Sequence, residues 1–165
     1  HDMKVIRLGE MFEGETKRLE MIAGLWKKAG FYVETFSDIN QLIWEKFICN
    51  VAVSGAAAAF NRTVGEIIED PITWEIAKKL GIEAFSVGKA KNIAFTFNEP
   101  IKYIKDFFQN MPNAKPSMLL DLEAHRKTEV ESINGAVPII AQSLGLNAPY
   151  NEVIAAIIKT KESQF

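Results

Sequence analysis

The chain has 165 residues and a formal net charge of −2, and 48% of its residues are hydrophobic. This is enough apolar material for the core of one ordinary domain, which excludes disorder as the main state. The balanced charge argues against a nucleic-acid binder of the basic-patch kind. One cysteine and two histidines exclude a disulfide framework and a metal centre built from thiolates or several imidazoles.

The first part of the chain has the pattern of a small βαβ-like piece. His1-Asp2-Met3 is interpreted as a remnant of cloning and is left out of the fold prediction. Residues 5–9 and 31–35 are predicted strands, and residues 15–29 have apolar side chains at helical spacing. Such a piece cannot bury both faces of a sheet, so residues 4–36 are expected to be the trailing edge of something larger.

From residue 37 to residue 165 the signals are helical, so the fold class is predicted to be mainly α. Two possible capping boxes stand out, one from Thr63 to Glu66 and one from Thr128 to Glu131. The second box predicts a helix that begins there and runs to Leu144. Proline or aspartate marks the start of most of the others, which are expected at 39–60, 71–91, 100–110, 117–126 and 149–162.

No segment has the pattern of a signal peptide. The longest apolar run, residues 51–60, is too short to span a bilayer. The sequence therefore predicts a cytoplasmic protein without a membrane partner.

The predicted helix at 39–60 is apolar on nearly every face, yet it carries three polar residues four positions apart. Lys46, Asn50 and Ser54 form one stripe along it. A buried polar group costs about 1–3 kcal/mol unless it is hydrogen-bonded. The stripe has two interpretations. The lysine reaches solvent and the other two bond to backbone, or all three line a substrate groove in which Lys46 is a cation or proton donor.

A second polar set lies further along the chain. Ser117 and Asp121 are one helical turn apart on the same face, and Glu129 falls in the first turn of the next predicted helix, just after Thr128. A carboxylate in a first turn is favoured by the helix dipole alone. By itself, this set is more typical of helix capping than of a binding site.

Together, the two sets resemble the signatures of the ketopantoate reductase family, in its C-terminal helical domain. Residues 44–50 resemble the family's tryptophan-x-lysine-x-x-x-asparagine signature. Residues 117–121, 126–129 and 133–135 resemble its second signature, and residues 148–151 resemble the proline-x-asparagine opening of its last core helix. The likeness covers nearly the whole chain and both signatures occur in order.

The resemblance implies a fold of the 6-phosphogluconate dehydrogenase-like type. It makes residues 4–36 the end of an N-terminal Rossmann domain and residues 37–165 the helical substrate-binding and dimerisation domain. It implies an NADPH-dependent reduction of 2-dehydropantoate to pantoate, a step toward pantothenate and coenzyme A, and it allows a homodimer. Because no glycine-x-glycine-x-x-glycine fingerprint is present, NADPH is expected to bind mainly outside this chain, which alone would be inactive.

The resemblance also assigns roles. Lys46 would protonate the alkoxide formed by hydride transfer, and Glu129 would contact the hydroxyl end of the substrate. Asn50 and Ser117 would bind substrate, with Ser54 beside them and Asp121 in support.

Two positions depart from the family pattern, because Ser54 and Val64 stand where related reductases carry asparagines. The substrate could therefore be another 2-oxo acid, handled by a paralogous reductase or a related hydroxyacid dehydrogenase. A different class also stays open, namely a free-standing helical module for dimerisation or ligand binding without catalysis.

Overall fold

A computed structural model of the chain describes residues 5–11, 14 and 16–165. The chain divides into two compact units, residues 1–44 and 45–165, each taken by itself below. The interpretation of residues 1–3 as a cloning remnant lies outside the described residues. The predicted domain boundary after residue 36 stays a prediction.

The first unit contains two parallel strands and a helix. Strand β1 (Ile6–Gly9) pairs with β2 (Val33–Phe36), with Ile6 opposite Val33. Helix α1 (Lys17–Lys28) connects them. The Thr16 hydroxyl accepts the amide N–H of Leu19 at 3.1 Å and so caps the first turn. The strand–helix–strand order predicted from the sequence is confirmed.

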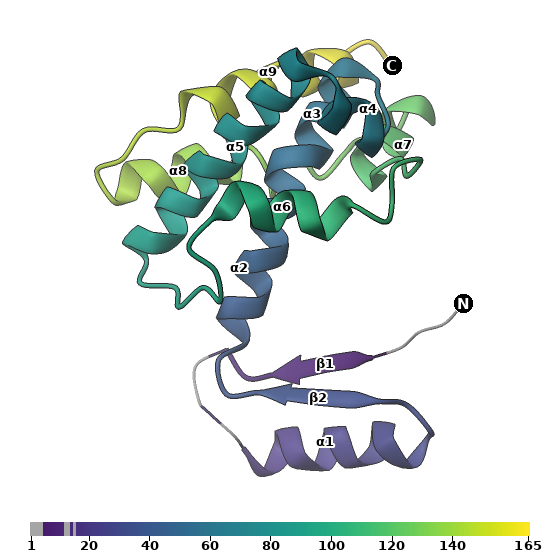
Figure 1. Ribbon diagram of the computed structural model, residues 1–165, viewed down its shortest axis with the longest axis vertical. Helices are drawn as coiled ribbons and strands as arrows, with labels where there is room; N and C mark the ends of the chain where they lie inside the picture. Colours follow the sequence, from purple (N-terminus) through teal and green to yellow (C-terminus); the bar gives the residue numbers. More distant parts are fainter. Residues whose placement is uncertain (1–4, 12–13, 15) are drawn as a thin grey trace. The chain divides into compact units, whose positions relative to one another are not determined.

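After β2 the described chain is helical, so the mainly α fold class is confirmed (Figure 1). Its elements, in chain order, are α2 (Ile39–Cys49), the π-helical segment η1 (Asn50–Ser54), α3 (Gly55–Phe60), α4 (Val64–Glu69), α5 (Pro71–Ala90), α6 (Pro100–Phe108), α7 (Ser117–Glu123), α8 (Ala136–Ser143) and α9 (Pro149–Glu162).

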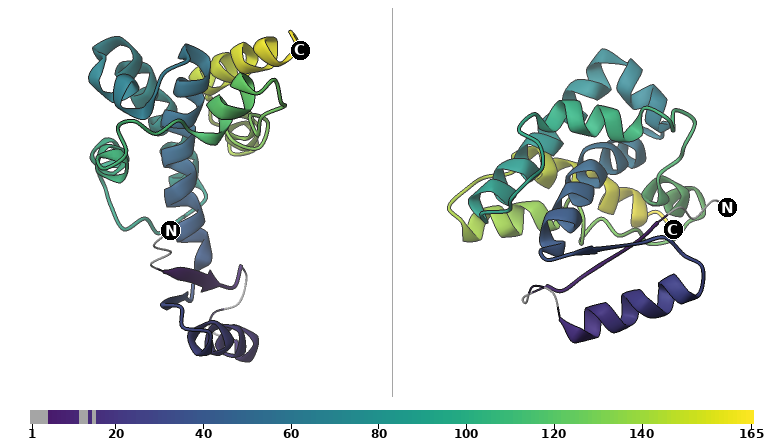
Figure 2. Two further views of the ribbon diagram at one scale, coloured as in Figure 1. Left: turned by 90° about the vertical axis from the view of Figure 1, so that its right-hand side faces the viewer. Right: turned by 60° about the horizontal axis from the view of Figure 1, so that its bottom comes forward.

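The core of the second unit is built around η1 and α3. Helices α4, α5 and α7 pack against both, and α9 packs against α3, so these two segments are enclosed from several sides (Figures 1 and 2). Residues 51–53 and 56–58 are fully buried. Small side chains in residues 56–59 let the neighbouring helices approach closely, which explains the alanine run.

The continuous helical stretch Ile39–Phe60 has the length and apolar composition of a membrane-spanning helix, with a mean hydropathy of 1.2 in its most apolar window. However, 67% of that window is buried inside the protein. Core helices of globular proteins have the same composition, so this stretch is weak evidence for a membrane span.

The second predicted capping box is wrong. The Thr128 hydroxyl accepts the N–H of Val130 at 3.1 Å, two residues on, rather than that of Glu131. Glu131 forms an ion pair with Lys159 at 2.8 Å. The helix begins only at Ala136. The chain from 128 to 135 is therefore a succession of turns, because contacts from α9 replace the reciprocal bonds that a capping box needs.

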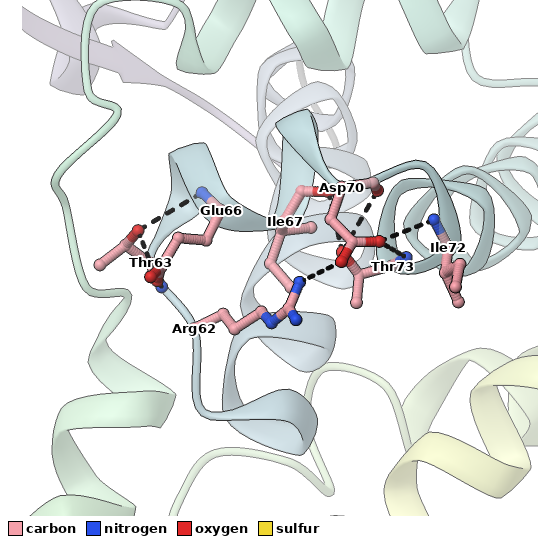
Figure 3. A network of polar contacts seen from close by, with 7 residues as sticks. All are labelled: Arg62, Thr63, Glu66, Ile67, Asp70, Ile72 and Thr73. Atoms are coloured by element: carbon pink, nitrogen blue, oxygen red, sulfur yellow. Dashed lines mark hydrogen bonds and ion pairs between the residues drawn. The ribbon is translucent and has the colours of Figure 1, made fainter.

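The first predicted capping box is present at the corner between α3 and α5 (Figure 3). The Thr63 hydroxyl accepts the N–H of Glu66, whose carboxylate accepts the N–H of Thr63 at 2.7 Å. Next to it, Asp70 accepts the N–H groups of Ile72 and Thr73 at 2.8 and 3.1 Å and caps α5. Arg62 also donates to Asp70, at 2.5 Å.

This corner predicts a pH dependence of stability. The Arg62 guanidinium, with the N–H groups of Thr73 and Ile72, holds the pKa of the Asp70 carboxyl below its usual value of 3.8. Because the pKa is lower in the folded state, the stabilisation is complete above the unfolded pKa and is lost as the pH falls through the folded one. Asp70→Asn keeps a capping oxygen but loses the charge.

We therefore expect wild type to have a higher urea midpoint than Asp70→Asn at pH 7, with the difference shrinking below about pH 4. Urea titrations of both proteins between pH 7 and pH 3 measure it. A difference that stays constant down to pH 3 would contradict the assigned role of the Asp70 charge.

Candidate functional site

The predicted polar stripe runs from the surface into the interior of the second unit. Lys46, in the last turn of α2, is exposed, and Asn50, the first residue of η1, is half-buried. Ser54, the last residue of η1, is buried, with 6% of its surface exposed. The turn that carries the two inner residues is a π-helix rather than the α-helix expected from the sequence. Such segments occur frequently at functional sites.

A buried asparagine lies against the π segment. The Asn134 side-chain amide donates to the carbonyl of Val51, inside η1, and to the Asn151 side chain, at 2.9 Å each. Asn151 in turn donates to the carbonyl of Leu80 at 3.2 Å. Asn134 also fills the space where a side chain of Gly55 would begin. The asparagines of the second signature and of the last helix therefore hold η1, α5 and α9 together.

The second polar set comes from α7 and from the turns that follow it. Ser117 is the exposed first residue of α7, which packs against η1 and α3. Glu129 is exposed in the turns between α7 and α8. Asn134 anchors the end of these turns on η1. The fold thus brings the two signatures onto neighbouring elements, although no hydrogen bond links any two of the six candidate side chains.

The candidates differ in whether their polar groups already have partners. Asp121 accepts two hydrogen bonds from Arg126, at 3.0 and 2.7 Å. Within the part of the chain that the structure describes, no protein group hydrogen-bonds the side chains of the other candidates, which are Lys46, Asn50, Ser54, Ser117 and Glu129. Asp121 is thus engaged in the structure, whereas the polar groups of the other five have no hydrogen-bond partner among the described residues.

Sequence reasoning missed Glu45, a buried carboxylate beside Lys46. It accepts the N–H and the hydroxyl of Thr96 at 2.8 and 2.7 Å and the Tyr103 hydroxyl at 3.3 Å. These bonds fasten the chain between α5 and α6 to the end of α2. A glutamate in a largely apolar helix was the available signal, but its partners are more than fifty residues away in sequence.

Cys49 is also buried next to the stripe. Burial, together with the nearby Glu45 carboxylate, raises the pKa of the Cys49 thiol to about 12. The nucleophilic thiolate is therefore scarce at neutral pH, as expected for an unreactive cysteine in a protein core.

Among residues 5–11, 14 and 16–165, no group of three or more histidine, cysteine, aspartate or glutamate side chains could hold a metal ion. In the first unit, Gly9 ends β1, and a Cβ there would lie 2.8 Å from both Ile39 Cβ and the Phe36 carbonyl oxygen. Close packing, rather than a phosphate cradle, therefore explains this glycine.

Comparison with solved structures finds the same fold in other proteins. Chains of a dimeric ketopantoate reductase from Staphylococcus aureus (TM-score 0.83, 21% identity) and of D-mandelate dehydrogenase with NADH and anilino(oxo)acetate (TM-score 0.86, 20% identity) share it. The matches cover 98% and 97% of this chain and 54% and 67% of those chains, respectively. At these identities the likeness concerns the fold.

Sequence comparison defines the family. The family model for the C-terminal part of ketopantoate reductase PanE/ApbA matches residues 38–162, and the chain belongs to this family. It is 28% identical over 156 residues to the 2-dehydropantoate 2-reductase of Archaeoglobus fulgidus, covering 94% of this chain and 52% of that protein. The chain spans about half the length of the curated relatives that it matches. The resemblance drawn from the two signatures is confirmed.

Proposed function

We propose that this chain is the substrate-binding part of an NADPH-dependent reductase that converts 2-dehydropantoate, or a closely related 2-oxo acid, into the 2-hydroxy acid. The observation that carries the proposal is the group of five polar side chains without protein partners, on elements that pack together around a π-helical turn. These are Lys46, Asn50, Ser54, Ser117 and Glu129.

The chemistry of ketone reduction suits these groups. When bound, NADPH would supply a hydride to the carbonyl carbon. The carbonyl oxygen then becomes an alkoxide, which needs a nearby cation and a proton. Lys46 provides both, since its ammonium group is exposed and is the one cation of the stripe. This interaction strengthens as negative charge develops, so it favours the transition state.

The other side chains orient the substrate. The Asn50 amide and the Ser54 and Ser117 hydroxyls donate hydrogen bonds to the carboxylate and carbonyl oxygens of the substrate. The Glu129 carboxylate accepts from its hydroxyl group. Asp121 acts in support, because it holds Arg126 at the end of α7. Fixing both ends of the substrate limits the orientations in which hydride transfer can occur.

Partners and location follow from the same proposal. We propose a small 2-oxo acid as the ligand, no nucleic-acid or membrane partner, and a cytoplasmic location. A homodimer is proposed by analogy with the S. aureus reductase, which is described as dimeric.

A paralogous substrate is the second candidate, and two positions favour it. Val64 is buried, with 1% of its surface exposed, and its hydrocarbon side chain has no group that could hydrogen-bond a substrate, unlike the asparagine of related reductases. Ser54 is shorter than an asparagine and leaves more room at the inner end of the stripe. Both changes remove amide groups that would bind hydroxyl or carboxylate oxygens, so a 2-oxo acid with a different substituent becomes a candidate.

A substrate panel tests the proposal. The gene product that carries this chain is assayed for NADPH oxidation with 2-dehydropantoate and with 2-oxo acids that differ at C3, and the best substrate is repeated with NADH. We expect 2-dehydropantoate to give the highest kcat/KM, with each changed methylene costing about 10- to 200-fold. A preference for another 2-oxo acid would select the paralogous reductase. No oxidation with any acid would favour the non-catalytic helical module.

A further inference from the structure

The last turn of α9 holds the turns that carry Glu129. The Glu162 carboxylate accepts the backbone N–H of Thr128 at 2.6 Å. Nearby, Lys159 pairs with Glu131 at 2.8 Å. Lys161 donates to the carbonyls of Ala58 and Ala59, at 2.9 and 2.7 Å, at the end of α3. One turn of α9 is therefore bonded both to α3 and to the 128–131 segment.

Both neighbours of Glu129 in the chain are fixed, although its own side chain is exposed. Thr128 is held from outside by Glu162, and its hydroxyl accepts the N–H of Val130 at 3.1 Å. Val130 is fully buried. The direction in which the Glu129 side chain leaves the backbone is therefore set by a backbone that is anchored on both sides.

We propose that Glu162 is a positioning residue for Glu129, which rests on the proposed function. Among the residues that the structure describes, Glu162 is the one side chain from outside the 128–135 segment that bonds to the backbone beside Glu129. Without it, the Thr128 N–H loses its acceptor, and the segment is anchored mainly through Val130 and Asn134. Glu129 would then reach the substrate in a wider range of orientations, and misplacements of about 1 Å can cost about 100-fold in rate.

Four variants of the gene product that carries this chain test the proposal by steady-state kinetics with its best 2-oxo acid. They are Glu162→Ala, Glu162→Gln, Glu129→Gln and the double variant Glu129→Gln/Glu162→Ala. Glu152→Ala, which removes an exposed carboxylate from the first turn of the same helix, is the matched control.

We expect Glu162→Ala to lower kcat/KM about 10- to 100-fold. The loss is expected to fall on kcat and on KM in the same proportion as the loss in Glu129→Gln. Glu162→Gln, whose amide oxygen can still accept the Thr128 N–H, is expected to stay within about threefold of wild type. If Glu162 acts through Glu129, the double variant is no worse than Glu129→Gln alone. Glu152→Ala is expected to match wild type.

Two results would overturn the proposal. One is a Glu162→Ala enzyme as active as wild type beside an impaired Glu129→Gln enzyme, and the other is a double variant whose loss is the product of the single losses. An unimpaired Glu129→Gln enzyme would instead refute the role of Glu129 in the proposed function. Urea midpoints check folding, and Glu162→Asp, whose carboxylate is one methylene shorter, replaces Glu162→Ala if that variant is partly unfolded.

Discussion

Replacing Lys46 by alanine is expected to lower turnover of the gene product that carries this chain by about 100- to 10,000-fold, the range for loss of a general acid. The ammonium group is the one cation of the Lys46–Asn50–Ser54 stripe, so its loss leaves the alkoxide without a proton donor and without charge compensation. Because Lys46 is exposed and no described protein group bonds to it, the urea midpoint is expected to stay unchanged.

Lys46→Arg separates the two parts of this role. Arginine keeps the positive charge but does not release a proton in the accessible pH range, so we expect it to recover substrate affinity more than kcat. Steady-state kinetics of both variants, beside Lys89→Ala as a control at an exposed lysine in the last turn of α5, provide the measurement. Wild-type turnover in Lys46→Ala would remove Lys46 from the mechanism.

Among the Gly→Ala substitutions in the second unit, each of which adds one methyl group, Gly55→Ala is expected to be the most destabilising. A Cβ at Gly55 would lie 2.4 Å from Asn134 Oδ1 and 2.6 Å from Asn134 Nδ2. Asn134 cannot move away without breaking its bonds to the Val51 carbonyl and to Asn151. Overpacking and the loss of buried hydrogen bonds together predict a decrease of about 2–5 kcal/mol in the free energy of unfolding.

Urea denaturation followed by circular dichroism measures this loss. Gly24→Ala is the matched control, because Gly24 lies inside α1 and no heavy atom lies within 4 Å of its added Cβ. Alanine has a higher helix propensity than glycine, so this control substitution is expected to increase the free energy of unfolding by about 0.5–1 kcal/mol. Gly55→Ala/Asn134→Ala should not recover wild-type stability, because the Val51 carbonyl and the buried Asn151 side chain would lose the hydrogen bonds that Asn134 donates. A Gly55→Ala protein as stable as wild type would contradict the packing described for Asn134.

Only part of the candidate site could be predicted from local sequence patterns. Lys46, Asn50 and Ser54 were found because polar residues at a spacing of four stand out in an apolar helix. The same reasoning failed for Thr128 and Glu131, which have the letters of a capping box but bond elsewhere, since α9 lies against that segment. Glu45 and Glu162 were missed because their partners are distant in the chain, and a single sequence carries no signal for such pairs.

By itself, the sequence determined the mainly α fold class, the order of the elements and the two signatures that define the family. Periodicity, capping residues and motif spacing are local properties of the chain, so they can be read without coordinates. Only the tertiary structure decided that residues 50–54 form a π-helix, that Asn134 packs on Gly55, and that Asp121 already has a partner. The first two features depend on contacts between distant segments, where packing and burial outweigh local preference, whereas the partner of Asp121 lies only five residues further along the chain.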